Sequence, residues 1–370
     1  GAGKTTLAEA VAYATGVITR KGRVEDGNTI SDYDKEEINR QFSISASVIP
    51  IEWNGLKINI LDAPGYFDFV GQMEDAMIVV NGKAGVEVGT IKAWEICERR
   101  KIPRIFFVTN MDDPNAKYMQ TVEELKENFG KKVAPFHLPI LDGDTLTGYV
   151  NVVKMGGRKF KDDAGNYEEM EIPESVTSEL EPVREQLMEA VAESDEELMD
   201  KYFAGEEFTY EEISQALRKS VISCDIVPVQ IGSGATCQGV NSFLQTCEKY
   251  FPAPDKAEVF KEATNLDTGE DVLGDYDASK PVSAYVFKTI MDPFVGKYSL
   301  VKVRTGILKA GDTVYNATKD VEEKLSKLYV MRGKDVMEVL ELYSGDIGAI
   351  GKLASTRTGD TLSTRGWPIE

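Results

Sequence analysis

Histidine, cysteine and long apolar runs are scarce in this sequence, and each scarcity argues against a class of protein. The 370 residues include one histidine, His137, so we expect neither a multi-histidine metal site nor a histidine-centred triad. The four cysteines, at positions 97, 224, 237 and 247, show no C-x-x-C spacing, which indicates reduced thiols in a cytoplasmic protein. No run approaches about 18 apolar residues, so we expect no membrane span and no membrane partner.

Basic residues are also fewer than acidic residues. The chain has 42 Lys and Arg against 62 Asp and Glu, a formal net charge of −20. Because such a field repels phosphate, we expect no DNA partner and only weak binding of isolated RNA. The hydrophobic share of 42% is ordinary for folded proteins, and the length predicts two or three domains.

The first six residues match half of a phosphate-binding motif. They read G-A-G-K-T-T and precede an apolar helical face that ends near Gly16. In the full motif, G-x-x-x-x-G-K-[ST], backbone N–H groups surround phosphate, the lysine reaches the β and γ phosphates, and the hydroxyl ligates Mg²⁺. The alternative is a threonine at the start of an ordinary helix. The phosphate-binding residues expected here are Ala2, Gly3, Lys4, Thr5 and Thr6.

A second motif follows a predicted β-hairpin. Strand-like residues 45–53 and 56–61 flank Asn54-Gly55, a strong signal for a two-residue turn. The second strand ends in D-A-P-G, with Asp62 and Gly65. An aspartate at the carboxyl end of a strand beside a phosphate loop can hold Mg²⁺ through water, and the glycine lets a backbone N–H approach the γ-phosphate. Alone, D-x-P-G would indicate only a turn; after G-K-T it favours a nucleotide site.

Two further strand ends carry candidate base-binding residues. Residues 105–108 form a predicted strand that ends in T-N-M-D, and the carboxylate of Asp112 can accept two hydrogen bonds from a guanine edge. Residues 226–231 end in G-S-G-A, whose small residues would let backbone donors reach the base; a structural glycine turn explains this segment equally well. The guanine-binding residues expected here are Thr109, Asn110, Asp112, Ser233, Gly234 and Ala235.

In this order, the four motifs resemble those of the translational GTPases, and specifically elongation factor G and its paralogues. The resemblance covers essentially the whole chain and implies the first two of the family's five domains. It implies GTP or GDP and Mg²⁺ as ligands, and a cytoplasmic monomer that binds the ribosome through ribosomal RNA and stalk proteins. Residues 40–45 resemble the first switch, which places Ser43 beside Thr5 as a Mg²⁺ ligand.

Three departures from the family pattern bear on activity. Tyr66 stands where the family has the histidine that positions the attacking water, so hydrolysis is expected to be slowed or differently organised. Thr109 and Asn110 replace the first two residues of N-K-x-D, which predicts weaker guanine binding. Only residues 70–74 precede the next strand, where the family has a helix of about three turns, so either this helix is short or residues are missing from the sequence.

The fold class expected is an α/β P-loop GTPase domain, with a mostly parallel sheet covered by helices on both faces, an α+β insertion, and then an all-β barrel. The predicted domains are 1–254, with the insertion at about 142–223, a linker at 255–281, and the barrel at 282–370. Predicted helices cover 91–101 and 118–129, and others open at Ser194 and at a capping box that starts at Thr209. Predicted barrel strands include 282–290, 298–305, 312–316, 324–331 and 346–353.

Several functions fit these features. The first is a ribosome-associated GTPase resembling elongation factor G, whose full-length form couples hydrolysis to translocation. The second is a nucleotide-gated ribosome binder with little hydrolysis, which Tyr66, Thr109 and Asn110 motivate. The third is a ribosomal protection factor of the tetracycline-resistance type. A non-translational ATPase would require Asp112 to be irrelevant to base choice. The glutamate-rich insertion is either a solvated face or a partner surface.

Overall fold

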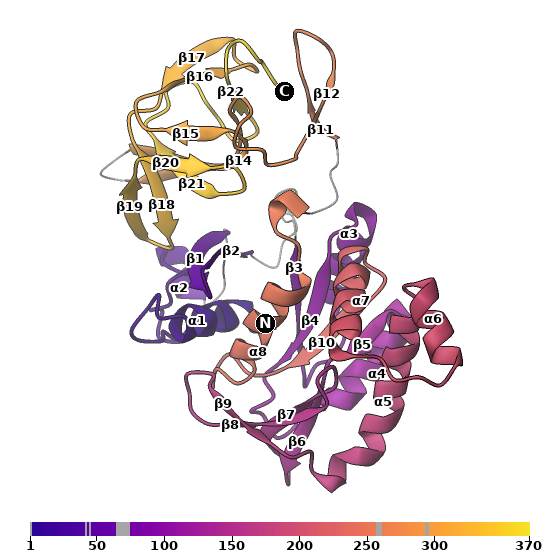
Figure 1. Cartoon of the computed structure of the whole chain (residues 1–370). Helices are drawn as coiled ribbons and strands as arrows, with labels where there is room; N and C mark the ends of the chain where they lie inside the picture. Colours follow the sequence, from indigo (N-terminus) through magenta and orange to yellow (C-terminus); the bar gives the residue numbers. More distant parts are fainter. Residues whose placement is uncertain (1, 41–42, 44–45, 64–74, 257–260, 293–295) are drawn as a thin grey trace.

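The structure is a computed structural model in which residues 2–40, 43, 46–63, 75–256, 261–292 and 296–370 are described. Two bodies follow each other along the chain, an α/β body and a body of antiparallel strands (Figure 1). The prediction for residues 70–74 lies outside the described residues. Among the described helices, none is both long and apolar enough to cross a membrane.

A four-stranded parallel sheet forms the centre of the described α/β body, in the order β3-β4-β10-β5. Helices cover both of its faces (Figure 1). These elements are β3 (Ala76–Asn81), β4 (Arg104–Thr109), β5 (Val133–Pro135), β10 (Val227–Ile231), α1 (Lys4–Ala14), α3 (Val88–Arg100), α4 (Tyr118–Phe129) and α8 (Val240–Tyr250).

Strand β4 shows why both faces need a helical cover. Its side chains are all buried, and successive residues point to opposite faces of the sheet. Ile105 and Phe107 pack into the core formed with α1 and α8. Phe106 and Val108 pack into the core formed with α3 and α4. The carboxyl end of this strand therefore lies between the two helical layers. Its last residue, Thr109, begins the predicted base-binding segment.

The hairpin of β1 (Ser47–Trp53) and β2 (Leu56–Asp62) forms as the sequence predicts, with positive φ at Asn54 and Gly55. It pairs only with itself among the described strands and does not extend the central sheet. Ile49 and Ile51 pack in the core with α1 instead. The short helix α2 (Lys35–Arg40) precedes the hairpin.

The insertion has its own core, made by an antiparallel sheet and three helices. The structure adds a strand, β6, that begins before the predicted boundary at 142, and Asp195 rather than Ser194 caps α6. The capping box of Thr209 and Glu212 is confirmed. These elements are β6 (His137–Asp142), β7 (Thr145–Asn151), β8 (Gly156–Phe160), β9 (Tyr167–Met170), α5 (Glu174–Ala192), α6 (Glu196–Phe203) and α7 (Tyr210–Ile222).

The second body packs antiparallel strands around an apolar core, as the predicted barrel requires, and a second apolar cluster joins several of these strands to Val48 of β1. Its described strands run in the order β17-β16-β22-β13-β14-β21-β18-β19, beside the pair β15-β20. The expected single strand 324–331 is two strands, and the expected linker carries a hairpin, β11–β12. These elements are η2 (Pro254–Lys256), β11 (Lys261–Thr264), β12 (Asp271–Leu273), β13 (Ser283–Asp292), β14 (Gly296–Thr305), β15 (Ile307–Lys309), β16 (Thr313–Asn316), β17 (Val321–Lys324), β18 (Leu328–Arg332), β19 (Asp335–Val339), β20 (Glu341–Tyr343), β21 (Ile347–Gly351) and β22 (Thr361–Ser363).

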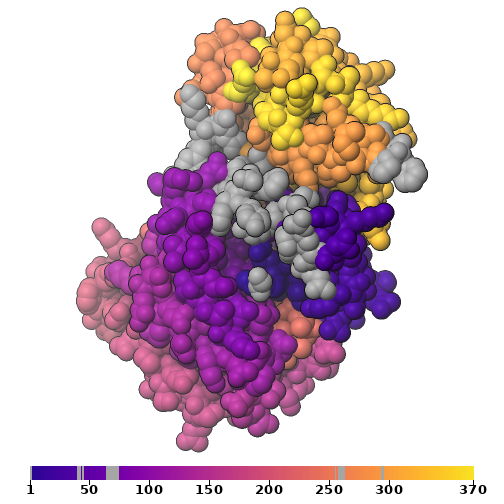
Figure 2. Space-filling view, turned by 180° about the vertical axis from the view of Figure 1, so that it is seen from behind, coloured from indigo at the N-terminus to yellow at the C-terminus, as the bar shows by residue number. Residues whose placement is uncertain are grey.

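The turn between β18 and β19 contacts the N-terminal region of the chain. The N–H of Gly333 donates to the carbonyl oxygen of Val48 at 3.0 Å. A Cβ at Gly333 would lie 1.9 Å from the carbonyl oxygen of Ile30, so only glycine fits this approach. Lys57, in β2, forms an ion pair with Asp346 at 2.7 Å. Figure 2 shows the indigo N-terminal region at the junction between the two bodies.

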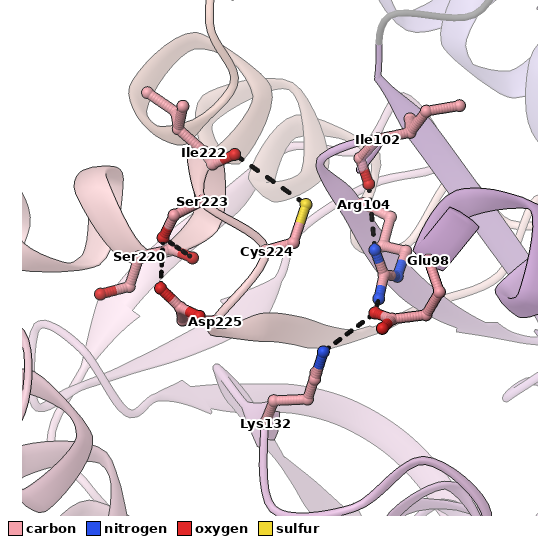
Figure 3. A network of polar contacts seen from close by, with 9 residues as sticks. All are labelled: Glu98, Ile102, Arg104, Lys132, Ser220, Ile222, Ser223, Cys224 and Asp225. Carbon is pink, nitrogen blue, oxygen red and sulfur yellow. Dashed lines mark hydrogen bonds and ion pairs between the residues drawn. The ribbon is translucent and has the colours of Figure 1, made fainter. Parts of the chain in front are cut away.

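A buried arginine joins α3 to β4 (Figure 3). The guanidinium of Arg104 lies 4.0 Å from the ring centroid of Trp94, donates to the carbonyl of Ile102 at 3.1 Å and pairs with Glu98. Lys132 donates to the same Glu98 carboxylate at 2.9 Å. The Nε of Arg104 is buried and has no hydrogen-bond partner in the described part of the chain. The ion pair with Glu98 therefore offsets part of the free-energy cost of burying the Arg104 guanidinium.

Removing Glu98 is expected to cost more stability than removing the arginine itself. Glu98→Ala leaves a buried guanidinium without its carboxylate, which we expect to lower the free energy of unfolding by about 2 kcal/mol. Arg104→Met keeps most of the volume against Trp94 and removes the buried charge, so a change within about 1 kcal/mol is expected. Urea unfolding of both variants checks this order, and an equal loss in both would contradict it.

The single histidine lies in the interior, where β6 meets α8. The ring of His137 packs against that of Tyr149 at a tilt of 34°, with centroids 4.2 Å apart, and its Nε2 lies 2.9 Å from the hydroxyl of Ser242. Burial lowers the pKa of His137 from 6.5 to about 3, and the charge of Arg158 acts in the same direction. The folded protein therefore holds this ring neutral.

This buried ring predicts a loss of stability in acid. Because the folded-state pKa is depressed, the stabilisation is complete above pH 6.5 and is lost as pH falls from 6.5 toward 3. Urea unfolding of the wild type and of His137→Gln between pH 7.5 and 5 measures the effect. The free energy of unfolding of the wild type should fall by about 1.4 kcal/mol more than that of the variant for each pH unit below 6.5. Parallel pH profiles would contradict the prediction.

Candidate nucleotide site

The predicted phosphate-binding residues lie at the N-terminus of α1. Gly3 is the residue before the helix and has a φ of 81°, a left-handed conformation that favours glycine. Lys4, Thr5 and Thr6 form the first turn of the 11-residue helix, where backbone N–H groups and the helix dipole favour an anion.

The hydroxyl of Thr5 joins three segments that are far apart in the sequence. It donates to Oδ2 of Asp62 at 2.8 Å and lies 2.9 Å from the hydroxyl oxygen of Ser43. Asp62 is the last residue of β2, so the hairpin delivers its carboxylate to the helix N-terminus. The predicted Mg²⁺ ligands Thr5 and Ser43 are therefore adjacent, and Asp62 is in contact with the first of them.

Asp32 also belongs to this cluster, although no motif in the sequence indicates it. Its Oδ1 accepts a hydrogen bond from the hydroxyl of Ser43 at 2.7 Å. Its Oδ2 is buried without a hydrogen-bond partner in the ranges that the structure describes. A carboxylate oxygen in this position is costly unless a cation or a further donor meets it.

A buried glutamate holds the segment that carries Asp32. Glu9, in α1, accepts hydrogen bonds from the N–H of Gly22 at 2.7 Å and of Ile30 at 2.8 Å. Burial raises the pKa of Glu9, and the two backbone donors act against that shift. These contacts run from a side chain to the backbone of a loop, which explains why no spacing pattern points to Asp32.

Side-chain oxygens of Asp32, Ser43, Thr5 and Asp62 lie in a row with three short contacts between them, but the two hydroxyls supply only two hydrogens. If both carboxylates are ionised, one contact therefore joins two oxygens with no hydrogen between them. Burial raises the pKa of Asp62 to about 6; the hydrogen bond from Thr5 opposes this, and the charge of Asp32 adds to it. The cluster is therefore built to accept a cation or a proton.

These residues fit Mg²⁺. Two hydroxyl and two carboxylate oxygens are hard ligands, and Mg²⁺ sites commonly use one or two carboxylates together with substrate phosphates. Within the described residues, no group of three or more His, Cys, Asp or Glu side chains could hold a metal alone. Thr5, Ser43, Asp62 and Asp32 would hold the ion, which would neutralise charge on bound phosphates.

The predicted base-binding segments also meet. The hydroxyl of Ser233 donates to Oδ1 of Asp112 at 2.6 Å. The N–H of Met111 donates to the carbonyl of Gly232 at 3.3 Å, because β4 and β10 are neighbours that end at the same edge. A Cβ at Gly234 would lie 2.8 Å from the backbone nitrogen of Leu7, so this turn packs directly against α1.

The two residues that depart from the family pattern lie between the base and phosphate segments. Thr109 is fully buried, and its hydroxyl has no hydrogen-bond partner in the part of the chain that is described. Asn110 has a φ of 59°, a conformation that asparagine tolerates better than most residues. A Cβ at Gly3 would lie 3.4 Å from Oδ1 of Asn110. Asn110 therefore packs against the phosphate loop.

The remaining predicted site residues are accounted for as follows. Ala2 is described and half-buried beside α1, and Ala235 lies in the turn after Ser233. Gly65 and Tyr66 lie outside the described residues, so the catalytic position stays a prediction from sequence.

Comparisons with known proteins agree with the two-body fold. Residues 1–253 match the family model of the elongation factor Tu GTP binding domain, and residues 281–365 match that of elongation factor G domain 2. A crystal structure of a protein from Thermus thermophilus is 32% identical, with a TM-score of 0.84. That match covers 100% of this chain and 53% of the other, so the chain spans about half of its length.

The hydroxyl of Ser43 predicts a specific requirement for metal binding. Ser43→Ala removes one oxygen ligand and leaves Asp32 without its donor, so about tenfold more Mg²⁺ should be needed for tight nucleotide binding. Ser43→Thr keeps the hydroxyl and should stay within about twofold of the wild type. A Mg²⁺ titration of nucleotide affinity checks both variants. Equal Mg²⁺ dependence in Ser43→Ala and the wild type would exclude a metal role for this residue.

Proposed function

Because the chain belongs to the elongation factor G-like translational GTPases, we propose that it binds GTP and GDP with Mg²⁺ at the N-terminus of α1 and hydrolyses GTP. In the full-length protein we propose that hydrolysis is low alone, is stimulated by the ribosome and is coupled to translocation. The ribosome is the proposed partner, through ribosomal RNA and stalk proteins, and the protein is proposed to act in the cytoplasm as a monomer.

The observation that carries this proposal is the convergence of four motifs on one helix end. Thr5 contacts Asp62 and Ser43, Gly3 packs against Asn110, and Gly234 packs against the backbone of the first turn. Each segment comes from a different loop of the α/β body. Phosphoryl transfer needs mainly positioning and charge stabilisation, and this cluster supplies both.

The proposed roles follow from the chemistry of each group. Backbone N–H groups of the first turn and Lys4 bind the β and γ phosphates. Thr5, Ser43, Asp62 and Asp32 would hold Mg²⁺, which would neutralise phosphate charge, and the carboxylate of Asp112 accepts from the guanine edge. The peptide of Gly65 would approach the γ-phosphate.

Tyr66 supports a second candidate, a nucleotide-gated ribosome binder with little hydrolysis. In the family, a histidine at this position positions the attacking water, and the tyrosine ring contains no nitrogen that could replace those of the imidazole. Binding and switching would survive this change, because the phosphate and metal contacts come from other residues.

GTP turnover by the full-length protein, with and without ribosomes, separates the two candidates. We expect ribosomes to raise turnover at least about tenfold with GTP and to leave an ATP control unchanged. Tyr66→His should raise stimulated turnover further, with Tyr66→Phe as the matched control. Tight GTP binding without stimulated turnover would favour the second candidate. Equal binding of ATP and GTP would exclude both.

A further inference from the structure

A lysine contacts the turn that contains the predicted base-binding donors. The Nζ of Lys21 donates to the carbonyl oxygen of Ala235, and also lies 3.4 Å from the carbonyl oxygen of Gly234. Cys237 Sγ is 3.5 Å from the same nitrogen. Lys21 follows α1 in the sequence and is half-buried, so it reaches the turn from a third segment. No role described above uses this cation.

The other sides of this turn are fixed by contacts already described. Gly234 lies against the backbone of α1, and Ser233 is hydrogen bonded to Asp112. The hydroxyl of Ser233 also accepts from the N–H of Ala235 at 3.2 Å. Lys21 therefore closes a ring of contacts around the turn, and its charge acts directly on two of the turn's peptide groups.

The charge of Lys21 changes what this turn can donate. The carbonyl of Gly234 and the N–H of Ala235 belong to one peptide group. A cation at the oxygen draws electron density from the nitrogen, which makes the N–H a stronger hydrogen-bond donor. Guanine carries the acceptor O6, whereas adenine carries an amino donor at the equivalent position. A polarised N–H at Ala235 thus favours guanine over adenine.

We propose that Lys21 is a positioning residue for guanine recognition, which fixes and polarises the 233–236 turn so that the Ala235 N–H donates to O6 of the bound base in place of its 3.2 Å contact with Ser233. This inference rests on the proposed GTP-binding function. Asn110 is uncharged, so it supplies no cation beside the base. Asp112 recognises the N1 and N2 donors, and Lys21 acts on the opposite acceptor, through the backbone of another segment.

Three nucleotides separate the two halves of this recognition. Inosine triphosphate keeps O6 and the N1 donor and lacks only the N2 amine, whereas 2-aminopurine riboside triphosphate keeps the amine and lacks both O6 and the N1 donor. Binding of GTP and of both analogues to the full-length protein with Mg²⁺ is measured by calorimetry. The variants are Lys21→Met, which keeps the apolar stem, and Lys21→Arg, which keeps the charge. Arg20→Met is the matched control, because it removes the adjacent exposed cation.

Lys21→Met should weaken the binding of GTP and of inosine triphosphate about tenfold, which is the size of one charge-assisted hydrogen bond. It should change the binding of 2-aminopurine riboside triphosphate less than about twofold. Lys21→Arg and Arg20→Met should both stay near the wild type. Equal weakening of all three nucleotides by Lys21→Met would show a merely structural role. No weakening of any would also overturn the proposal. Thermal unfolding of each variant verifies that the fold is intact.

The same titrations keep this inference distinct from the proposed function. If the wild type binds ATP as tightly as GTP, the proposed function fails before Lys21 is considered. If the wild type prefers GTP and Lys21→Met keeps the full preference for O6, only the inference about Lys21 fails.

Discussion

The hydrogen bond between Thr5 and Asp62 is the contact on which the arrangement of this site depends. It ties the first turn of α1 to the end of a hairpin that is not part of the central sheet. Through Ser43 and Asp32, the same hydroxyl connects to the segment that follows α1. Two buried carboxylates so close together are unfavourable without a cation. They lower the stability of the protein without ligand and favour the binding of a nucleotide that brings a metal ion.

Much of the site could be predicted from the sequence, because its motifs sit at strand ends and helix starts. The carboxyl ends of parallel strands meet at one edge, which is why Asp112 and Ser233 come together although 121 residues separate them. Asp32 could not be found in this way. Its place depends on Glu9, whose carboxylate binds backbone N–H groups of a loop, and such contacts leave no pattern of residue types.

The fold shows the same division. Strand β4 and helix α4 have strong local patterns and form where they were expected. The hairpin β11–β12 within the expected linker has strands of only 4 and 3 residues, too short for alternation to stand out. The sequence did not indicate strand β6, because only one residue separates it from β5 and no turn signal marks its start. That the β1–β2 hairpin packs on α1 and on the second body, and not beside β3, is set by tertiary packing alone.

The approach of Gly333 to Ile30 ties the two bodies together thermodynamically. Ile30, whose carbonyl oxygen the β18–β19 turn approaches, lies two residues before Asp32, and its N–H donates to Glu9. A ligand that moves this turn would act on the backbone of the segment that carries Asp32. Linkage is reciprocal, so whatever factor a partner of the second body imposes on nucleotide affinity, the nucleotide imposes on that partner. Gly333, which has no side chain, permits the close contact between the two bodies on which such a linkage would depend.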